Sequence, residues 1–266
     1  MVILKNVYNS ILDALFPRSS AEIESLSYSP EDAWEKLPKA PATPVANTYA
    51  IFAYKDERVS KLIWNIKYKK SAQAVKIGGY ALYMQFVGFF ETGGDTPSPR
   101  ATISTESNSL KKNLLSGYRS ANALLEGVSP PVSKNPTLHN TLVLPIPITN
   151  KRRNERGYNQ CELLVDEMKR LDTKNQFMVC KDLLERVHHL SRQTLKNRAD
   201  RLESAKDIFA INESELKKLL AKNIGIENTT VVVIDDVITT GSTIKEAMGV
   251  IKSAGFKNVF GLSLAH

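Results

Sequence analysis

The stretch VVVIDDVITTGST, residues 231–243, decides the fold because it combines a buried strand, an acidic pair and a turn rich in hydroxyl groups. Its four leading apolar residues are typical of a strand that is covered on both faces. The segment after the turn predicts a helix with one apolar face, formed by Ile244, Ala247, Met248 and Ile251. A final strand over residues 259–264 follows Gly255, which is placed to end that helix.

The same alternation of strand and helix begins earlier in the chain. Residues 141–146 predict another buried strand, and residues 178–180 predict a further short one. Between them lies a helix with apolar residues at helical spacing, namely Leu163, Leu164, Met168 and Leu171. Strands that alternate with helices form parallel sheets with right-handed connections. The sequence therefore predicts an α/β fold with a parallel, twisted sheet flanked by helices.

Four regions are expected along the chain. Residues 1–48 predict an N-terminal amphipathic helix followed by an irregular, proline-containing linker. Residues 49–90 predict a short strand and two helices, which would form a small accessory region. Residues 91–140 begin with a stretch rich in Gly, Pro, Ser and Thr, which favours a mobile insertion with one short helix. Residues 141–266 would form the core of the fold.

The composition limits the class of protein. The 266 residues carry 36 Lys and Arg against 28 Asp and Glu, a net charge of +8, which favours polyanionic partners such as nucleotides, diphosphates or nucleic acid. Cys161 and Cys180 are too few for a disulfide framework or a four-cysteine zinc site, so a reducing cytoplasm is expected. No segment is long and apolar enough to predict insertion into a membrane.

The acidic pair and the turn behind it form the candidate site. Asp235 and Asp236 fall at the carboxyl edge of the predicted sheet, where open parallel sheets bind ligands. The turn can direct backbone N–H groups and hydroxyls at one phosphate through Thr239, Thr240, Gly241, Ser242 and Thr243. Two carboxylates would repel that phosphate unless a sugar or Mg²⁺ lay between them. A phosphorylated ribose would therefore suit both the acidic pair and the turn. The plainer alternative is a strand end followed by an ordinary helix cap.

In this strand–loop–helix context, residues 232–243 closely resemble the fingerprint with which type I phosphoribosyltransferases bind phosphoribosyl diphosphate (PRPP). The resemblance implies a type I phosphoribosyltransferase-like core over residues 141–266. It also implies that residues 239–243 hold the 5-phosphate, while Asp235 and Asp236 hold the ribose hydroxyls and, through water, Mg²⁺. No direct protein ligand of a metal ion is predicted. Neither a Walker loop nor a GxGxxG dinucleotide motif is present.

An arginine-rich segment narrows the resemblance. Residues 152–160, RRNERGYNQ, look like the signature that follows the first core strand in the competence protein F (ComF/GntX-like) family. From the residues alone, a strand-to-helix loop over 151–157 could bind a diphosphate or could be a solvated basic loop. The resemblance implies that Arg153 and Arg156 steady the departing diphosphate. Gln193, Thr194 and Arg198 resemble the family's mobile segment, so Arg198 could close as a lid and act with the acidic pair in catalysis.

The N-terminal half carries the resemblance further, with one departure. Residues 12–18 and 54–68 look like the accessory (hood) region of this family. Relatives commonly place a zinc-binding cysteine cluster after the first of these segments, where this chain has Ser19 and Ser20. Zinc binding is therefore not predicted.

Three functions follow as expectations. The first is a Mg²⁺-dependent phosphoribosyltransferase that transfers a pentosyl group to an unidentified nucleobase or amine, with a link to DNA uptake in competence. The second is a non-catalytic PRPP-binding regulator or a single-stranded-DNA-binding adaptor of DNA-uptake proteins, suggested by aromatic and basic residues near 67–68 and 156–158. The third is a scaffold with a degenerate site, which the intact fingerprint disfavours.

Overall fold

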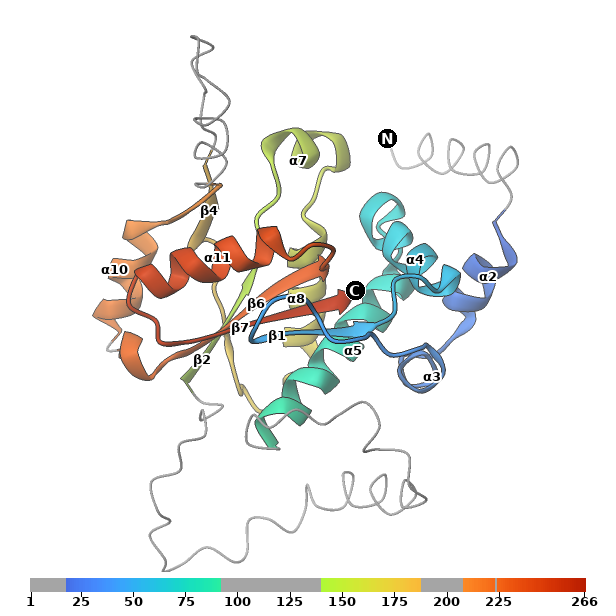
Figure 1. Ribbon diagram of the computed structural model, residues 1–266, viewed down its shortest axis with the longest axis horizontal. Helices are drawn as coiled ribbons and strands as arrows, with labels where there is room; N and C mark the ends of the chain where they lie inside the picture. Colours follow the sequence, from blue (N-terminus) through green and yellow to red (C-terminus); the bar gives the residue numbers. More distant parts are fainter. Residues whose placement is uncertain (1–17, 92–139, 188–207, 223) are drawn as a thin grey trace, which may run out of the picture.

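The computed structural model describes residues 18–91, 140–187, 208–222 and 224–266, and the statements below concern these residues (Figure 1). Their main sheet is parallel throughout, and its five strands follow the order β1-β7-β6-β2-β3. The strands are β1 (Thr48–Phe52), β2 (Thr141–Pro145), β3 (Met178–Val179), β6 (Thr230–Val237) and β7 (Asn258–Ala265). Every strand predicted above lies in this sheet, so the expected α/β fold is confirmed.

Helices cover both faces of the sheet. The helices α5 (Ala72–Glu91) and α8 (Gln160–Leu171) pack together on one face, and α11 (Ser242–Ser253) covers the other (Figure 1). Adjacent residues of β6 alternate between the two cores, because Val232 joins the first while Val231 joins the second. The predicted apolar face of α11 is buried through Ile244, Ala247, Met248 and Ile251. This packing on both faces explains why the strands are almost wholly apolar.

The strand β1 joins the N-terminal half of the chain to the main sheet. It pairs with β7 in parallel, with Thr48 beside Gly261 and Phe52 beside Ala265. Two further elements follow it, the helix α4 (Glu57–Trp64) and the π-helical turn η1 (Asn65–Lys69). The expected accessory segment therefore contributes a strand to the sheet and shares a hydrophobic core with residues 141–266.

Residues 18–48 contain two helices, so the expectation of an irregular linker is wrong for residues 20–36, whereas residues 37–47 are irregular. The helix α2 (Ser20–Ser27) begins at Ser19, whose hydroxyl accepts a hydrogen bond from the amide of Glu22. The helix α3 (Pro30–Lys36) begins in the same way at Ser29. Serine and proline at these positions start helices, whereas the prolines were interpreted as signs of irregular chain. The expected helix over residues 1–17 and the expected insertion lie outside the described residues.

The region before β6 contains elements that periodicity did not predict. The strands β4 (Leu184–Arg186) and β5 (Phe209–Ile211) form a separate antiparallel pair. The helix α10 (Glu213–Ala221) and the 3₁₀ turn η3 (Ile226–Asn228) lead from this pair to β6. Gly255 ends α11 with a φ of 101°, as its position suggested. Among the helices of the described residues, none has the length and apolar character needed to cross a membrane.

Candidate functional site

The acidic pair lies at the carboxyl end of β6. Asp235 and Asp236 are still within the strand, which continues to Val237, and Asp235 pairs with Ser263 of β7. Asp236 is buried, with 5% of its surface exposed, whereas Asp235 keeps partial exposure. The backbone amide of Asp236 donates to Oδ1 of Asp235 over 2.8 Å. Both carboxyl groups therefore lie at the sheet edge where ligands of parallel folds bind.

The charges around this pair are unequal. Nζ of Lys67, from η1, lies 3.1 Å from Oδ2 of Asp236, while Asp235 receives a weaker contact of 3.8 Å from the thiol of Cys161. Burial, with the neighbouring charge of Asp236, raises the pKa of Asp235 to about 7. The protein thus neutralises Asp236 with an ammonium group, and it lets Asp235 hold a proton near neutral pH.

The turn after β6 has the shape of a phosphate cradle. Gly241 adopts a φ of 78° and stands at the N-terminus of α11, while Thr239, Thr240 and Ser242 are exposed. The hydroxyls of Thr240 and Ser242 lie 3.1 Å apart. Gly241 itself is buried against Val45. The exposed hydroxyls and the first amides of a twelve-residue helix are donors suited to a single phosphate group.

The arginine-rich segment is a helix, so the expectation of a loop over 151–157 is wrong. The helix α7 (Asn150–Arg156) begins at Thr149, whose hydroxyl accepts from the amide of Arg152, and ends at Gly157 with a φ of 77°. A capping residue at one end and a left-handed glycine at the other define a short helix. The many charged residues between them were interpreted instead as a loop. Figure 1 shows α7 beyond the carboxyl end of β2.

The two predicted arginines of α7 have partners away from the acidic pair. Arg153 forms a 2.5 Å ion pair with Glu162. Arg156 donates to Gln160 over 2.9 Å, and its guanidinium lies 4.8 Å from the ring centre of Tyr68. Within the described residues, these arginines are therefore held near the site without touching the aspartates. Arg198, together with Gln193 and Thr194, lies outside the described residues.

Two basic residues of the site were not among the predicted site residues. Lys67 was expected only within the family-like accessory segment and among the aromatic and basic residues suggested for DNA, yet it contacts Asp236. Arg186, on β4, donates to the carbonyl of Pro147 over 3.4 Å. Burial and the positive charge of Arg152 lower the pKa of Arg186, and the charge of Asp235 opposes that shift. Only the tertiary fold brings these residues to the sheet edge, so no local pattern could have identified them.

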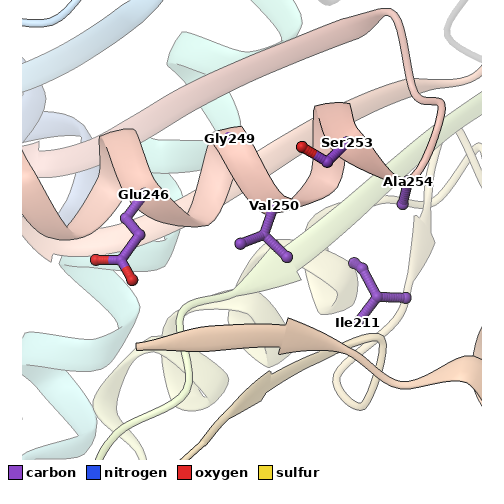
Figure 2. A pocket seen from close by; sticks show the side chains of 6 residues that line it. All are labelled: Ile211, Glu246, Gly249, Val250, Ser253 and Ala254. Carbon is purple, nitrogen blue, oxygen red and sulfur yellow. The ribbon is translucent and has the colours of Figure 1, made fainter. Parts of the chain in front are cut away.

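A cavity near the other end of α11 does not have the chemistry of a phosphate site. It measures about 530 Å³, and Figure 2 shows that it lies between α11 and β5. Its lining consists of Ile211, Glu246, Gly249, Val250, Ser253 and Ala254. The carboxylate of Glu246 accepts a hydrogen bond from the amide of Ile208. A cavity lined by one acid and mainly apolar residues does not suit a phosphate. The acidic pair and the turn after it are therefore the better candidate for the ligand site.

Comparison with known proteins supports part of the expected family resemblance. The parallel five-stranded sheet flanked by helices is consistent with a type I phosphoribosyltransferase-like core. The chain is 31% identical over 126 residues to Competence protein F of Haemophilus influenzae, which supports the expected ComF-like resemblance. That match covers 46% of this chain and 50% of the relative, so the chain spans about half the length of the curated relative that it matches. No family model matches the chain.

Proposed function

We propose that this protein binds PRPP together with Mg²⁺ and transfers its phosphoribosyl group to a nucleobase or an amine. The observation that supports this most strongly is the continuity of the site. Asp235 and Asp236 end β6, and the left-handed Gly241 turn starts α11 only a few residues later. Two carboxyl groups that could bind ribose hydroxyls and a turn that could bind phosphate therefore lie at one sheet edge, which supports binding of a phosphorylated ribose.

The transfer itself depends mainly on positioning and charge. Diphosphate leaves the anomeric carbon through an oxocarbenium-like transition state, so no side-chain nucleophile is needed. The turn over 239–243 would hold the 5-phosphate, and Asp235 and Asp236 would accept hydrogen bonds from the ribose hydroxyls. Arg153 and Arg156 would turn from their present partners to the departing diphosphate. Arg198 would join them from the segment before β5.

The acidic pair fits a magnesium ion that arrives on the ligand. In the part of the chain that the structure describes, no group of three or more His, Cys, Asp or Glu side chains could enclose a metal ion. Magnesium retains several waters and is commonly held by one or two carboxylates together with phosphates. Asp235 and Asp236 would therefore meet Mg²⁺ through water, and the ion would neutralise charge on the diphosphate. Both cysteines are free thiols, which suits the proposed cytoplasmic location.

A thermal-shift measurement tests the site before the chemistry. At about 100 times its Kd, Mg²⁺-PRPP stabilises a protein by about 2.7 kcal/mol, which raises Tm by several degrees in a chain of this size. We expect this rise for the wild type and its loss in the double variant Asp235→Asn, Asp236→Asn. A wild type without any shift would contradict PRPP binding. PRPP-dependent release of diphosphate with a panel of nucleobases and amines then tests transfer, and silence across the panel favours a non-catalytic regulator.

A strip of aromatic and basic side chains favours a second function, the binding of single-stranded DNA. Trp64 and Tyr68 are 41% and 57% exposed, and their ring centres lie 5.8 Å apart. Lys69 lies 5.1 Å from the ring centre of Trp64, and Arg156 lies 4.8 Å from that of Tyr68. Lys70 lies 5.4 Å from the ring centre of Tyr158. Alternating rings and cations bind bases by stacking and phosphates by charge.

Fluorescence anisotropy with a labelled oligonucleotide tests this second function. We expect binding that weakens as salt rises, because the cations release counterions from the strand. The double variant Trp64→Ala, Tyr68→Ala should weaken binding by about 1–3 kcal/mol per lost stacking contact. It should leave the Mg²⁺-PRPP thermal shift in place. Equal binding by variant and wild type would exclude the strip as the DNA surface.

A further inference from the structure

Lys67 provides the one ion pair of Asp236 within the described residues. Its Nζ lies 3.1 Å from Oδ2 of Asp236, and the two side chains are 22% and 7% exposed. This carboxylate oxygen is buried, and within the described residues it has the ion pair with Lys67 but no hydrogen-bond partner. A buried carboxylate oxygen without a partner is costly, so the contact with the ammonium offsets part of the cost of burying Oδ2. A ligand that uses Oδ2 competes with Lys67 for this oxygen.

The backbone that carries Lys67 is held from both sides. The buried side-chain amide of Asn65 donates to Glu22 over 3.1 Å and to the carbonyl of Lys61 over 3.0 Å. The hydroxyl of Tyr158, which follows α7, donates to the carbonyl of Ile66 over 2.9 Å. The turn is π-helical, a geometry that is frequent at functional sites. The backbone is thus fixed, whereas the four-carbon stem of the lysine can swing its ammonium group to a new partner.

A second cation, Arg156, contacts the turn that carries Lys67. Arg156 contacts Tyr68, the residue after Lys67, and donates to its hydroxyl over 3.4 Å. The end of α7 therefore places a second positive charge against η1, the turn that carries Lys67. An ammonium released from Asp236 stays on this basic turn, and negative charge on a bound ligand would attract it.

We propose that Lys67 is an exchanging cation: it pairs with Asp236 in the free protein and with the diphosphate group of PRPP in the complex. This inference rests on the proposed PRPP site. When the ribose hydroxyls reach Asp236, they donate hydrogen bonds to it in place of the ion pair with the ammonium, and the diphosphate receives the released charge. Lys67 thereby makes the site select PRPP over ribose 5-phosphate, which has the same sugar and 5-phosphate but no diphosphate. It acts as a specificity-determining residue.

Isothermal titration with two ligands tests this role. The wild type should bind Mg²⁺-PRPP more tightly than ribose 5-phosphate. Lys67→Gln, which can still donate a hydrogen bond to Asp236, should weaken PRPP binding by about tenfold, or roughly 1.4 kcal/mol. It should leave ribose 5-phosphate binding unchanged or tighter, because the ammonium no longer competes for Asp236. Lys67→Arg should restore most of the PRPP affinity. Lys76→Gln, an exposed position on α5 with the same loss of charge, is the matched control.

The outcomes separate this inference from the proposed function. A wild type that binds neither ligand contradicts the PRPP site itself. If the wild type binds both and Lys67→Gln weakens both equally, Lys67 has a structural role and the inference is wrong. If the loss in Lys76→Gln equals that in Lys67→Gln, the effect is one of general charge, which also overturns it. Loss confined to PRPP, with rescue by arginine, supports the exchange.

Discussion

Gly241 and Val45 meet although they come from opposite halves of the chain: a Cβ atom built on Gly241 would overlap Cγ2 of Val45. Gly241 also holds a φ of 78°, which residues with a side chain rarely adopt. The turn before α11 therefore rests directly on the segment that leads into β1. Its shape depends on the absence of a side chain at this one position.

Gly241→Ala should destabilise the protein and abolish the response to PRPP. The left-handed backbone costs about 1–2 kcal/mol for alanine, and overlap with Val45 adds about 1–3 kcal/mol. Urea unfolding should show the summed loss in the free energy of unfolding. The thermal shift with Mg²⁺-PRPP should disappear, because the turn can no longer direct its amides at one phosphate.

A double variant separates the two costs of Gly241→Ala. Val45→Ala removes Cγ2, while the Cβ of Val45 lies at an acceptable 3.5 Å from the added atom. Val45→Ala combined with Gly241→Ala should therefore recover the overlap cost but not the cost of the left-handed backbone. Strict additivity of the two single changes would show that they do not meet.

Asp235 should make the free protein less stable as pH rises from about 4 to about 7. Burial and Asp236 raise the pKa of its carboxyl group to about 7, against about 3.9 in an unfolded chain. Over this interval the folded state binds more protons than the unfolded state, so the free energy of unfolding falls with rising pH. Asp235→Asn removes this term and keeps an oxygen for the amide of Asp236. The difference between the Tm of Asp235→Asn and the Tm of the wild type should therefore increase by a few degrees as pH rises over this interval.

Thermal melts at several pH values, without ligand, provide the measurement. Asp166→Asn is a suitable control, because Asp166 is exposed on α8. The difference in Tm between this control and the wild type should not increase with pH as it does for Asp235→Asn. A difference between Asp235→Asn and the wild type that stays constant across the interval would show that Asp235 titrates as an ordinary carboxyl group.

Local pattern was sufficient for the strands of the main sheet, for the helix faces and for the local geometry of part of the candidate site. Val231 and its neighbours form a buried strand, and Ile244 and Ile251 face the core, because period and burial are properties of short segments. The acidic pair and Gly241 were recognisable for the same reason. They lie within one strand–turn–helix unit, whose local geometry alone brings them together.

The long-range contacts of the site could not be predicted in this way. Lys67 reaches Asp236, and Val45 supports Gly241, because β1 pairs with β7 and brings the N-terminal half to the sheet edge. Neither contact leaves a periodic trace in the sequence. The antiparallel pair β4–β5 was missed because its strands have three residues each. Residues 151–157 were interpreted as a loop because their many charged residues are a more conspicuous pattern than the capping residues Thr149 and Gly157.

Asn159 should be important for both stability and the site. Its Nδ2 donates to the carbonyl of Ile146 over 3.0 Å, and its Oδ1 accepts from the amide of Cys161 over 3.0 Å. The residue is buried and caps α8 at the point where the chain returns from α7. Asn159→Ala removes the cap and leaves a buried carbonyl unpaired. The expected loss is about 2–4 kcal/mol in the free energy of unfolding, measured in urea.

A matched change elsewhere isolates the effect of burial. Asn212 caps α10 with the same chemistry, accepting hydrogen bonds from the amides of Ser214 and Glu215, but these contacts lie nearer the surface. Asn212→Ala should cost only about 1 kcal/mol, the usual value for a lost cap. Equal losses at the two positions would show that the contact with Ile146 adds nothing.

Cys161 should resist thiol reagents as long as the protein is folded. It is fully buried beside Asp235, and burial with the charges of Asp235 and Asp236 raises the pKa of its thiol well above the ordinary value. Only the thiolate is a good nucleophile, so the group is both protonated and inaccessible. Cys180 is partly exposed and should react first.

Iodoacetamide labelling at about pH 8, followed by peptide mass analysis, can compare the two thiols. In Cys180→Ser, the folded protein should take up no label, and denaturant should expose one reactive thiol. Because the label cannot reach the carboxyl pair, the Mg²⁺-PRPP thermal shift should survive treatment of the folded protein. Rapid labelling of Cys161 without denaturant would mean that the end of β6 opens to solvent, and the buried contact between Lys67 and Asp236 would then be a minor state of the site.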